Sequence, residues 1–136
     1  MRRTIPFVVL VMCAAFTLPM LVASAGTTRC QGKEATLKGT SGDDELRGTY
    51  RADVIVGLGG DDVIYGKDGS DTICAGGGDD TVMGDWGQDS INGDSGDDEL
   101  NGGPGNDELN GGTGYDKLNG YWGDDTCVNG EENKSC

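Results

Sequence analysis

A nine-residue period constrains the fold of this chain more than any other feature of its sequence. Ten consecutive units of nine residues follow one another without a gap from Gly39 to Val128. A short fixed period is typical of solenoids, in which each unit packs against its neighbours and extends one continuous core. We therefore expect the repeat itself to be the fold.

Four positions of the unit are kept almost throughout. Position one is glycine except at Ala75, and position four is glycine except at Arg51. Position six is aspartate in all ten units, and position eight is aliphatic except at Cys127. Glycine permits the positive φ values of tight turns, and the aliphatic residue marks a strand. Each unit is thus predicted to be a turn over positions one to six and a three-residue strand.

The unit Gly102–Asn110, with the sequence GGPGNDELN, resembles the nonapeptide G-G-x-G-x-D-x-U-x of the repeats-in-toxin (RTX) calcium-binding family, in which U is a large aliphatic residue. The resemblance implies an all-β fold, a right-handed parallel β-roll in which two units make one turn of the coil. The family's second glycine is kept at Gly76, Gly103 and Gly112. We expect modest changes of turn geometry in the other units.

The resemblance also implies that the position-six aspartates bind calcium. Units alternate between two edges of a β-roll, so the odd-numbered units would form a column of Asp44, Asp62, Asp80, Asp98 and Asp116. The even-numbered units would form a column of Asp53, Asp71, Asp89, Asp107 and Asp125. Calcium ions would lie between neighbouring turns of a column, held by carboxylates and by carbonyl oxygens of the glycine-rich backbone. Four gaps in each column allow up to about eight ions.

Two observations limit this interpretation of the aspartates. Aspartate is common in solvated turns, although that explanation does not account for ten aspartates at one phase of the repeat. In the second unit, Arg51 places a bulky cation where glycine is expected, and Ala52 lacks a polar side chain. The count of eight sites therefore holds least for the chain ends and for the second unit, where Arg51 could repel calcium while Asp53 remains available.

Composition limits the metal ligands that the chain can offer and the partners that it can bind. The chain has 24 acidic and 10 basic residues and no histidine. An acidic chain repels nucleic acid and anionic lipid, so calcium is the expected partner and nucleic acid is not. Without imidazole, the abundant ligands are carboxylate and carbonyl oxygens, which suit hard cations. We expect no enzyme: a carboxylate-pair glycosidase is disfavoured because the repeat accounts for the aspartates and leaves no room for a cleft-forming domain.

Residues 1–25 are predicted to be a secretory signal peptide. Two arginines precede an apolar stretch from Ile5 to Val22, and Ala23-Ser24-Ala25 forms a small-residue cleavage pattern. A membrane anchor is the alternative, which the prolines of the stretch and the cleavage pattern disfavour. We therefore expect a secreted, extracellular protein without a membrane span after signal cleavage. Cleavage changes the net charge from −14 to −16, because it removes two arginines and no acids.

The rest of the chain divides into a predicted N-terminal cap at 26–38, the ten repeats at 39–128 and a C-terminal cap at 129–136. Leu37 falls at position eight of a unit that precedes the first, so residues 35–38 are predicted to form the first strand, although Ala35 replaces the aspartate. This segment would close the N-terminal end of the core.

Four cysteines remain after signal cleavage, and an even number in a secreted protein suggests disulfides. Continuing the period places Cys136 at position eight of an eleventh unit, so a bridge from Cys127 to Cys136 would cap the roll. Cys30 and Cys74 are the remaining pair. They lie over two turns apart, so a bridge between them requires the N-terminal segment to fold back, and free buried thiols are the alternative.

The leading functional interpretation is a secreted calcium-binding protein that folds when it binds the ion. The aliphatic side chains bury too little apolar surface to offset the entropy of ordering ten units, and the two carboxylate columns repel themselves. The alternative is a calcium-dependent extracellular adhesion or ligand-binding module; ice binding is disfavoured because no regular threonine ladder exists. Tyr50, Trp86 and Trp122 share position three on the even edge, where they either contact a ligand or pack along the turns.

Overall fold

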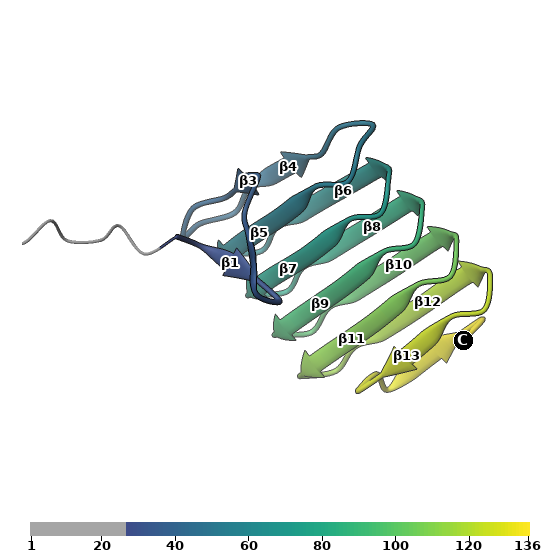
Figure 1. Ribbon diagram of the computed structural model, residues 1–136. Helices are drawn as coiled ribbons and strands as arrows, with labels where there is room; N and C mark the ends of the chain where they lie inside the picture. The colour runs from purple at the N-terminus through teal and green to yellow at the C-terminus, as the bar shows by residue number, and fades with distance from the viewer. Residues whose placement is uncertain (1–26) are drawn as a thin grey trace, which may run out of the picture.

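The computed structural model describes residues 27–136, which form an all-β roll of about five turns (Figure 1). The predicted signal peptide lies outside the described residues. The described part contains no helix that is long and apolar enough to cross a membrane.

Two six-stranded parallel sheets make up the roll. The first sheet contains β4 (Glu45–Arg47), β6 (Val63–Asp68), β8 (Thr81–Trp86), β10 (Glu99–Pro104), β12 (Lys117–Trp122) and β14 (Glu132–Lys134). The second sheet contains β3 (Leu37–Lys38), β5 (Val54–Gly59), β7 (Thr72–Gly77), β9 (Ser90–Ser95), β11 (Glu108–Thr113) and β13 (Thr126–Val128). A separate antiparallel hairpin contains β1 (Arg29–Cys30) and β2 (Lys33–Glu34). The chain alternates between the two sheets, so each turn of the roll uses two units, as predicted.

The core lies between the two sheets and consists of the position-eight side chains and Ala75, which stands at position one. Residues 18 positions apart pair in register, as Ile55 does with Ile73 and Ile64 with Val82. The buried core residues are Leu46, Ile55, Ile64, Ile73, Ala75, Val82, Ile91, Leu100, Leu109 and Leu118. Leu37 and Cys127 are partly buried and pack against the two ends of this column. The strand predicted at residues 35–38 covers only Leu37–Lys38 and is the first strand of the roll but not of the chain; Leu37 pairs with Ile55.

The inner strands are longer than predicted. Each of β5 to β12 has six residues, covering positions seven to nine of one unit and one to three of the next. Between β5 and β7, the paired residues of β7 run from Thr72 to Cys74, skip Ala75 and continue at Gly76. Pairing resumes because position two adopts a left-handed conformation that realigns the strand. The tight turn is therefore confined to positions four to six, not one to six.

Position two has positive φ in units three to ten whether or not it is glycine. The φ angles are 89° at Leu58, 81° at Lys67 and 83° at Tyr121, against 125° at Gly76. Residues with a Cβ stay closer to the left-handed helical region, where L-amino acids are least strained. The predicted modest change of turn geometry is thus confirmed for these units.

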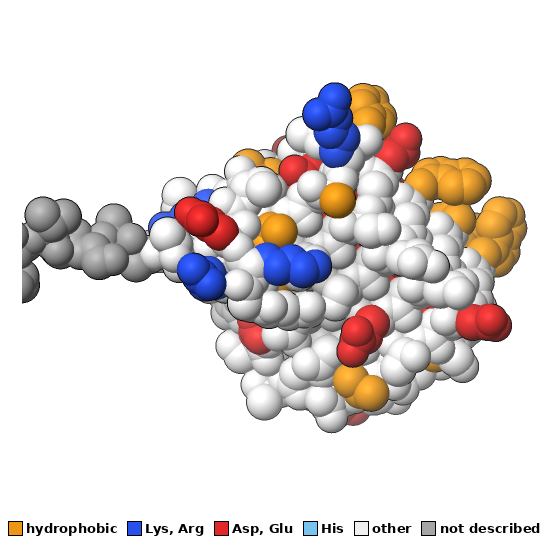
Figure 2. All heavy atoms as spheres, viewed as in Figure 1, with side chains coloured by type: hydrophobic (Ala, Val, Ile, Leu, Met, Phe, Trp, Pro, Cys, Tyr) orange, Lys and Arg blue, Asp and Glu red, His pale blue; other side chains and the backbone are white. Residues whose placement is uncertain are grey.

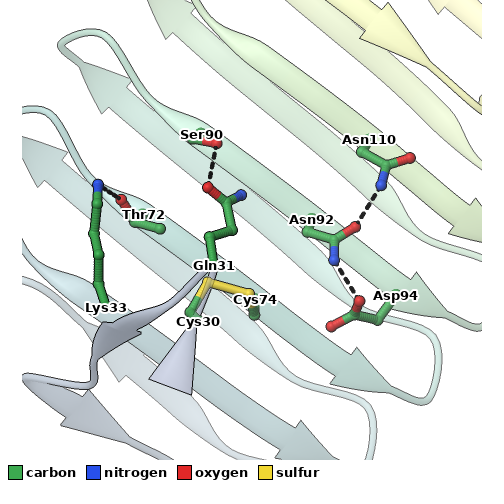
Figure 3. Close-up of a disulfide and its surroundings, with 9 residues drawn as sticks. All are labelled: Cys30, Gln31, Lys33, Thr72, Cys74, Ser90, Asn92, Asp94 and Asn110. Carbon is green, nitrogen blue, oxygen red and sulfur yellow. Dashed lines mark hydrogen bonds between the residues drawn. A yellow bond between two sulfur atoms is a disulfide. The ribbon is translucent and has the colours of Figure 1, made fainter.

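The N-terminal hairpin folds back over the outer face of the second sheet (Figure 1). A disulfide joins Cys30 to Cys74 with their Cα atoms 5.7 Å apart, and Val56 packs beside it. Figure 3 shows Lys33 donating to the hydroxyl of Thr72 at 2.7 Å and Gln31 accepting from Ser90. The pairing that required a folded-back segment is therefore present, and the free-thiol alternative is wrong.

The C-terminal end closes with a disulfide between Cys127 and Cys136, as predicted. The expected eleventh unit is wrong, because Asn133 pairs with Leu118 and Cys136 is exposed. The last turn has no glycine–aspartate motif and is three residues shorter than the repeat, since residue 118 pairs with residue 133 instead of 136. Cys136 thus reaches its partner from outside the core.

Candidate metal sites along the turns

The structure brings the ten predicted aspartates together in two columns, one along each edge of the roll. Within a column, the main-chain N–H of one aspartate donates to Oδ1 of the aspartate 18 residues later, over 2.8 to 2.9 Å. Glycine-rich turns of equal length make this register possible, because each aspartate follows the turn at the same place. One oxygen of each accepting carboxylate therefore links two turns.

The second carboxylate oxygen has a different environment. In eight aspartates Oδ2 is buried and has no hydrogen-bond partner: Asp62, Asp71, Asp80, Asp89, Asp98, Asp107, Asp116 and Asp125. A buried carboxylate oxygen without a partner carries a large desolvation cost. Eight such atoms recur at the same position of the repeat, and a cation is the kind of partner that fits all of them.

The unpaired oxygens point toward spaces that glycine leaves open. A Cβ built on Gly84 would meet both Oδ2 of Asp89 and the carbonyl oxygen of Gly102, one turn further along. A Cβ on Gly66 would likewise meet Oδ2 of Asp71 and the carbonyl oxygen of Gly84. Position one is therefore glycine beside seven of the eight unpaired oxygens, which leaves the carboxylate and the carbonyl of the next turn facing the same space. Beside Asp80 it is Ala75, the smallest residue with a Cβ, and that Cβ stands where the glycines leave space.

Carbonyl oxygens of position four also face the gap between turns. A Cβ built on Gly96 would meet the carbonyl oxygen of Gly78, and one built on Gly105 would meet that of Gly87. The Gly105 position lies beside Asp107 as well, whose Oδ1 is 3.0 Å from the same point. Each gap is thus lined by main-chain and carboxylate oxygens together.

This donor set fits calcium. Calcium takes six to eight oxygen ligands from carboxylates and carbonyls in a flexible geometry. Within residues 27–136, no three His, Cys, Asp or Glu side chains converge closely enough to hold a metal by themselves. Carbonyl oxygens of the turns would therefore have to complete any site.

The titration behaviour of the columns follows from burial. Burial, together with a smaller effect of neighbouring aspartates, raises the pKa of Asp80 and Asp89 to about 7 and that of Asp98 to about 6. Burial also raises the pKa of Asp107 to about 6. Without a cation, the charged form of these carboxylates is unfavourable in the folded chain.

Asp44 and Asp53, the first members of the two columns, differ from the other eight. Oδ2 of Asp44 accepts hydrogen bonds from the N–H of Thr40 at 2.6 Å and from its hydroxyl at 2.9 Å. Oδ2 of Asp53 accepts the same pair from Thr49 at 2.7 and 2.8 Å. In these two units a threonine occupies position two and satisfies the carboxylate that is unpaired elsewhere.

The threonine-bearing turns also explain Arg51. Neither Gly42 nor Arg51, at position four of the first two units, has positive φ, whereas Gly60 and Gly69 of the next turn do. A residue with a side chain is therefore tolerated at Arg51, and it is exposed.

Glu131 is a functional candidate that the period did not predict. Its Oε2 accepts the N–H of Asp116 at 2.7 Å, the position that the next aspartate of the odd column would take. Beside it, a Cβ on Gly111 would meet the carbonyl oxygen of Asn129 and Oδ2 of Asp116. The cap thus supplies oxygens to the last turn, but out of phase with the repeat, so the nine-residue pattern could not locate them.

A second acidic ladder runs outside the odd column and was also missed. The N–H groups of Asp61, Asp79, Asp97 and Tyr115 each donate to Oδ1 of the position-five aspartate one turn earlier. The signal was visible as Asp-Asp pairs in the first, third, fifth and seventh units. These exposed carboxylates add negative charge to the odd edge, whereas the even edge has one such aspartate, Asp124.

Comparison with known proteins agrees with this geometry. Residues 38–73, 65–100 and 101–133 match the family model for the RTX calcium-binding nonapeptide repeat. No curated protein and no solved structure gives a significant match. The matching segments together include both aspartate columns.

Proposed function

Because the chain belongs to the RTX calcium-binding nonapeptide repeat family, we propose that it is a secreted protein that folds into its roll by binding calcium between stacked turns. The repeats of this family are a structural, non-catalytic module. The observation that carries the proposal is the set of eight buried carboxylate oxygens without a partner. A calcium ion beside each would supply the missing positive charge.

The proposed ligands are oxygens of two successive turns. For the space beside Gly84, they include Oδ2 of Asp89 and the carbonyl oxygen of Gly102, which both face it. The eight unpaired oxygens support about eight ions, the number that the sequence predicts. The proposed sites are shifted toward the C-terminus, because threonines already satisfy Asp44 and Asp53.

The net charge of the chain supports the same number of calcium ions. The net charge is −16 once residues 1–25 are removed, and about eight divalent ions neutralise it. Until then, the stacked carboxylates oppose folding through mutual repulsion and desolvation. Binding and folding are therefore proposed to be one coupled event, because the turns that hold the ion do not stack without it.

The two disulfides are consistent with an oxidising environment, and extracellular calcium is abundant enough to saturate weak sites. Equilibrium dialysis of the mature chain against calcium tests the proposal, with magnesium as the competitor. We expect about eight calcium ions per chain and weak competition, since magnesium requires a stricter octahedron and gives up water reluctantly. Binding of one ion or none would contradict the proposal.

A further inference from the structure

Three exposed aromatic side chains stand at equal intervals along one edge of the first sheet. Tyr50, Trp86 and Trp122 are 76%, 65% and 68% exposed. Each lies 36 residues, or two turns of the roll, from the next. Figure 2 shows large hydrophobic side chains standing out from one edge of the molecule. Because water contacts most of each ring, packing within the roll does not account for this arrangement.

The main chain holds the two tryptophans in register. Trp122 pairs with Pro104 on the neighbouring strand β10. Gly105 donates its N–H to the carbonyl of Trp122 at 2.8 Å, and Gly87, directly after Trp86, donates to the carbonyl of Pro104 at 3.1 Å. The main chains at Trp86 and Trp122 are therefore two strand spacings apart, about 10 Å.

A shallow hollow lies on the first sheet between the strands that carry the two tryptophans. It is lined by Met83, Asp85, Asn101, Gly103, Pro104 and Tyr121. Gly103 contributes no side chain at position two, where the strands on either side carry Asp85 and Tyr121, and this gap opens the hollow. Tyr121 forms its wall on β12, and the rings of Tyr121 and Trp122 lie with their centroids 5.3 Å apart.

We propose that this edge binds a linear, neutral, β-1,4-linked polysaccharide. The flat apolar face of a pyranose ring carries C–H groups that pack against the negative face of an aromatic ring. In an extended β-1,4-linked chain, every second sugar presents the same face, and the two-sugar repeat has about the length of two strand spacings. One sugar would stack on Trp86 and another on Trp122, with the sugar between them over the hollow.

The polar groups of the hollow suit a ligand that carries hydroxyl groups rather than one that carries negative charges. The carboxylate of Asp85 accepts hydrogen bonds, and the amide of Asn101 both donates and accepts them. Asp68, between Tyr50 and Trp86 in the same column, and Asp85 are both acidic. They would repel a polysaccharide that carries carboxylate or sulfate groups, so the ligand is a neutral one. Tyr50 lies one further repeat along the row, but the ammonium of Lys67 stands 5.5 Å from the centroid of its ring, so the proposed stacking site consists of Trp86 and Trp122.

The inference rests on the proposed function, because only the folded, calcium-loaded roll aligns the rings. Titration of the mature chain in calcium with soluble cellohexaose tests it, followed by tryptophan fluorescence, since the chain has only the two tryptophans of this edge. We expect a saturable change with cellohexaose, retention on microcrystalline cellulose, and neither result with α-1,4-linked maltohexaose. Circular dichroism of the same samples reports folding separately.

Variants that lack one tryptophan are compared with a control variant that lacks an aromatic ring elsewhere. Trp86→Ala or Trp122→Ala is expected to weaken cellulose binding at least about tenfold. Tyr115→Ala, which removes a 49% exposed ring from the other edge, should leave binding unchanged. The inference would be overturned if the folded chain bound neither cellohexaose nor cellulose. It would also be overturned if a variant with both tryptophans replaced bound cellulose as the unmodified chain does. A chain that stays unfolded in calcium would overturn both proposals.

Discussion

The main-chain N–H of Asp71 donates to Oδ1 of Asp89, one turn further along the roll, over 2.8 Å. The other oxygen of Asp89 is buried and has no partner. One carboxylate thus ties two turns together and also presents an unsatisfied oxygen to the gap beside Gly84. The two roles reside on different atoms, so substitution can separate them.

Asp89→Asn should abolish the proposed calcium role and keep the structural one. The amide retains an oxygen for the N–H of Asp71 and places an N–H₂ group beside the carbonyl of Gly102. We expect about one calcium ion fewer per chain in equilibrium dialysis. We also expect more strand signal without calcium, because a buried charge has been removed.

Asp124→Asn is the matched control, since it removes the same charge from an exposed position of the even edge. It should leave the calcium count unchanged. An unchanged count in Asp89→Asn, or an equal loss in both variants, would exclude Asp89 as a ligand.

Acid should stabilise the metal-free fold and weaken calcium binding. The pKa of Asp80 and of Asp89 is raised to about 7 in the folded chain by burial, from about 3.9 in an unfolded one. The folded form thus binds more protons, and this contribution to stability is lost as pH rises from about 4 to about 7. Calcium-stripped chain should show more strand signal by circular dichroism at pH 5 than at pH 8.

At the same acidic pH, calcium should bind less tightly, because protons compete for the same oxygens. The comparison needs a calcium titration at each pH. Equal strand content of the stripped chain at both pH values would contradict the pH prediction.

The period was sufficient to predict the two sheets, their core and the aspartate columns, although it predicted strands of three residues where the structure has six. Eighteen residues after Ile64 stands another aliphatic residue, Val82, and 18 residues after Asp62 stands another aspartate. One pattern therefore predicts both the core and the aspartate columns. A parallel stack amplifies a local preference, because every unit meets an almost identical one above and below it.

The two ends could not be predicted in the same way. Cys30 reaches Cys74 through a hairpin that shares no period with the roll, and Glu131 replaces an aspartate from a turn shortened by three residues. Such contacts depend on how the chain returns over an existing surface. The left-handed conformation of Leu58 was hidden for another reason: the pattern of glycines predicts where the backbone turns, but neighbouring turns can impose that conformation on other residues.

Backbone strain at position two can be relieved without loss of packing. Leu58 has φ 89° and is 41% exposed, so Leu58→Gly should stabilise the calcium-loaded chain by about 0.5 to 1 kcal/mol. Gly78→Ala should have the opposite effect, about 2 kcal/mol or more, because the new Cβ would meet the carbonyl oxygen of Gly60. Urea unfolding at fixed calcium measures both changes. Destabilisation by Leu58→Gly would contradict this description of the turn.

The two disulfides should contribute unequally to the free energy of unfolding. The bridge from Cys30 to Cys74 spans 44 residues, and that from Cys127 to Cys136 spans 9. Loop entropy gives about 4 kcal/mol for the first and about 3 kcal/mol for the second. Replacing each pair by serines and unfolding the variants in urea at saturating calcium should therefore destabilise the Cys30–Cys74 variant more. The reverse order would show that the hairpin is not anchored as described.

The coupling of calcium binding to folding is tested most directly by one titration of the mature chain, with bound calcium and far-ultraviolet circular dichroism followed on the same samples. The unpaired oxygens of Asp62 to Asp125 predict little strand signal in excess chelator, a cooperative gain of strand that tracks calcium occupancy, and full reversal when chelator is restored. Complete strand signal in excess chelator, unchanged as calcium binds, would contradict the coupling.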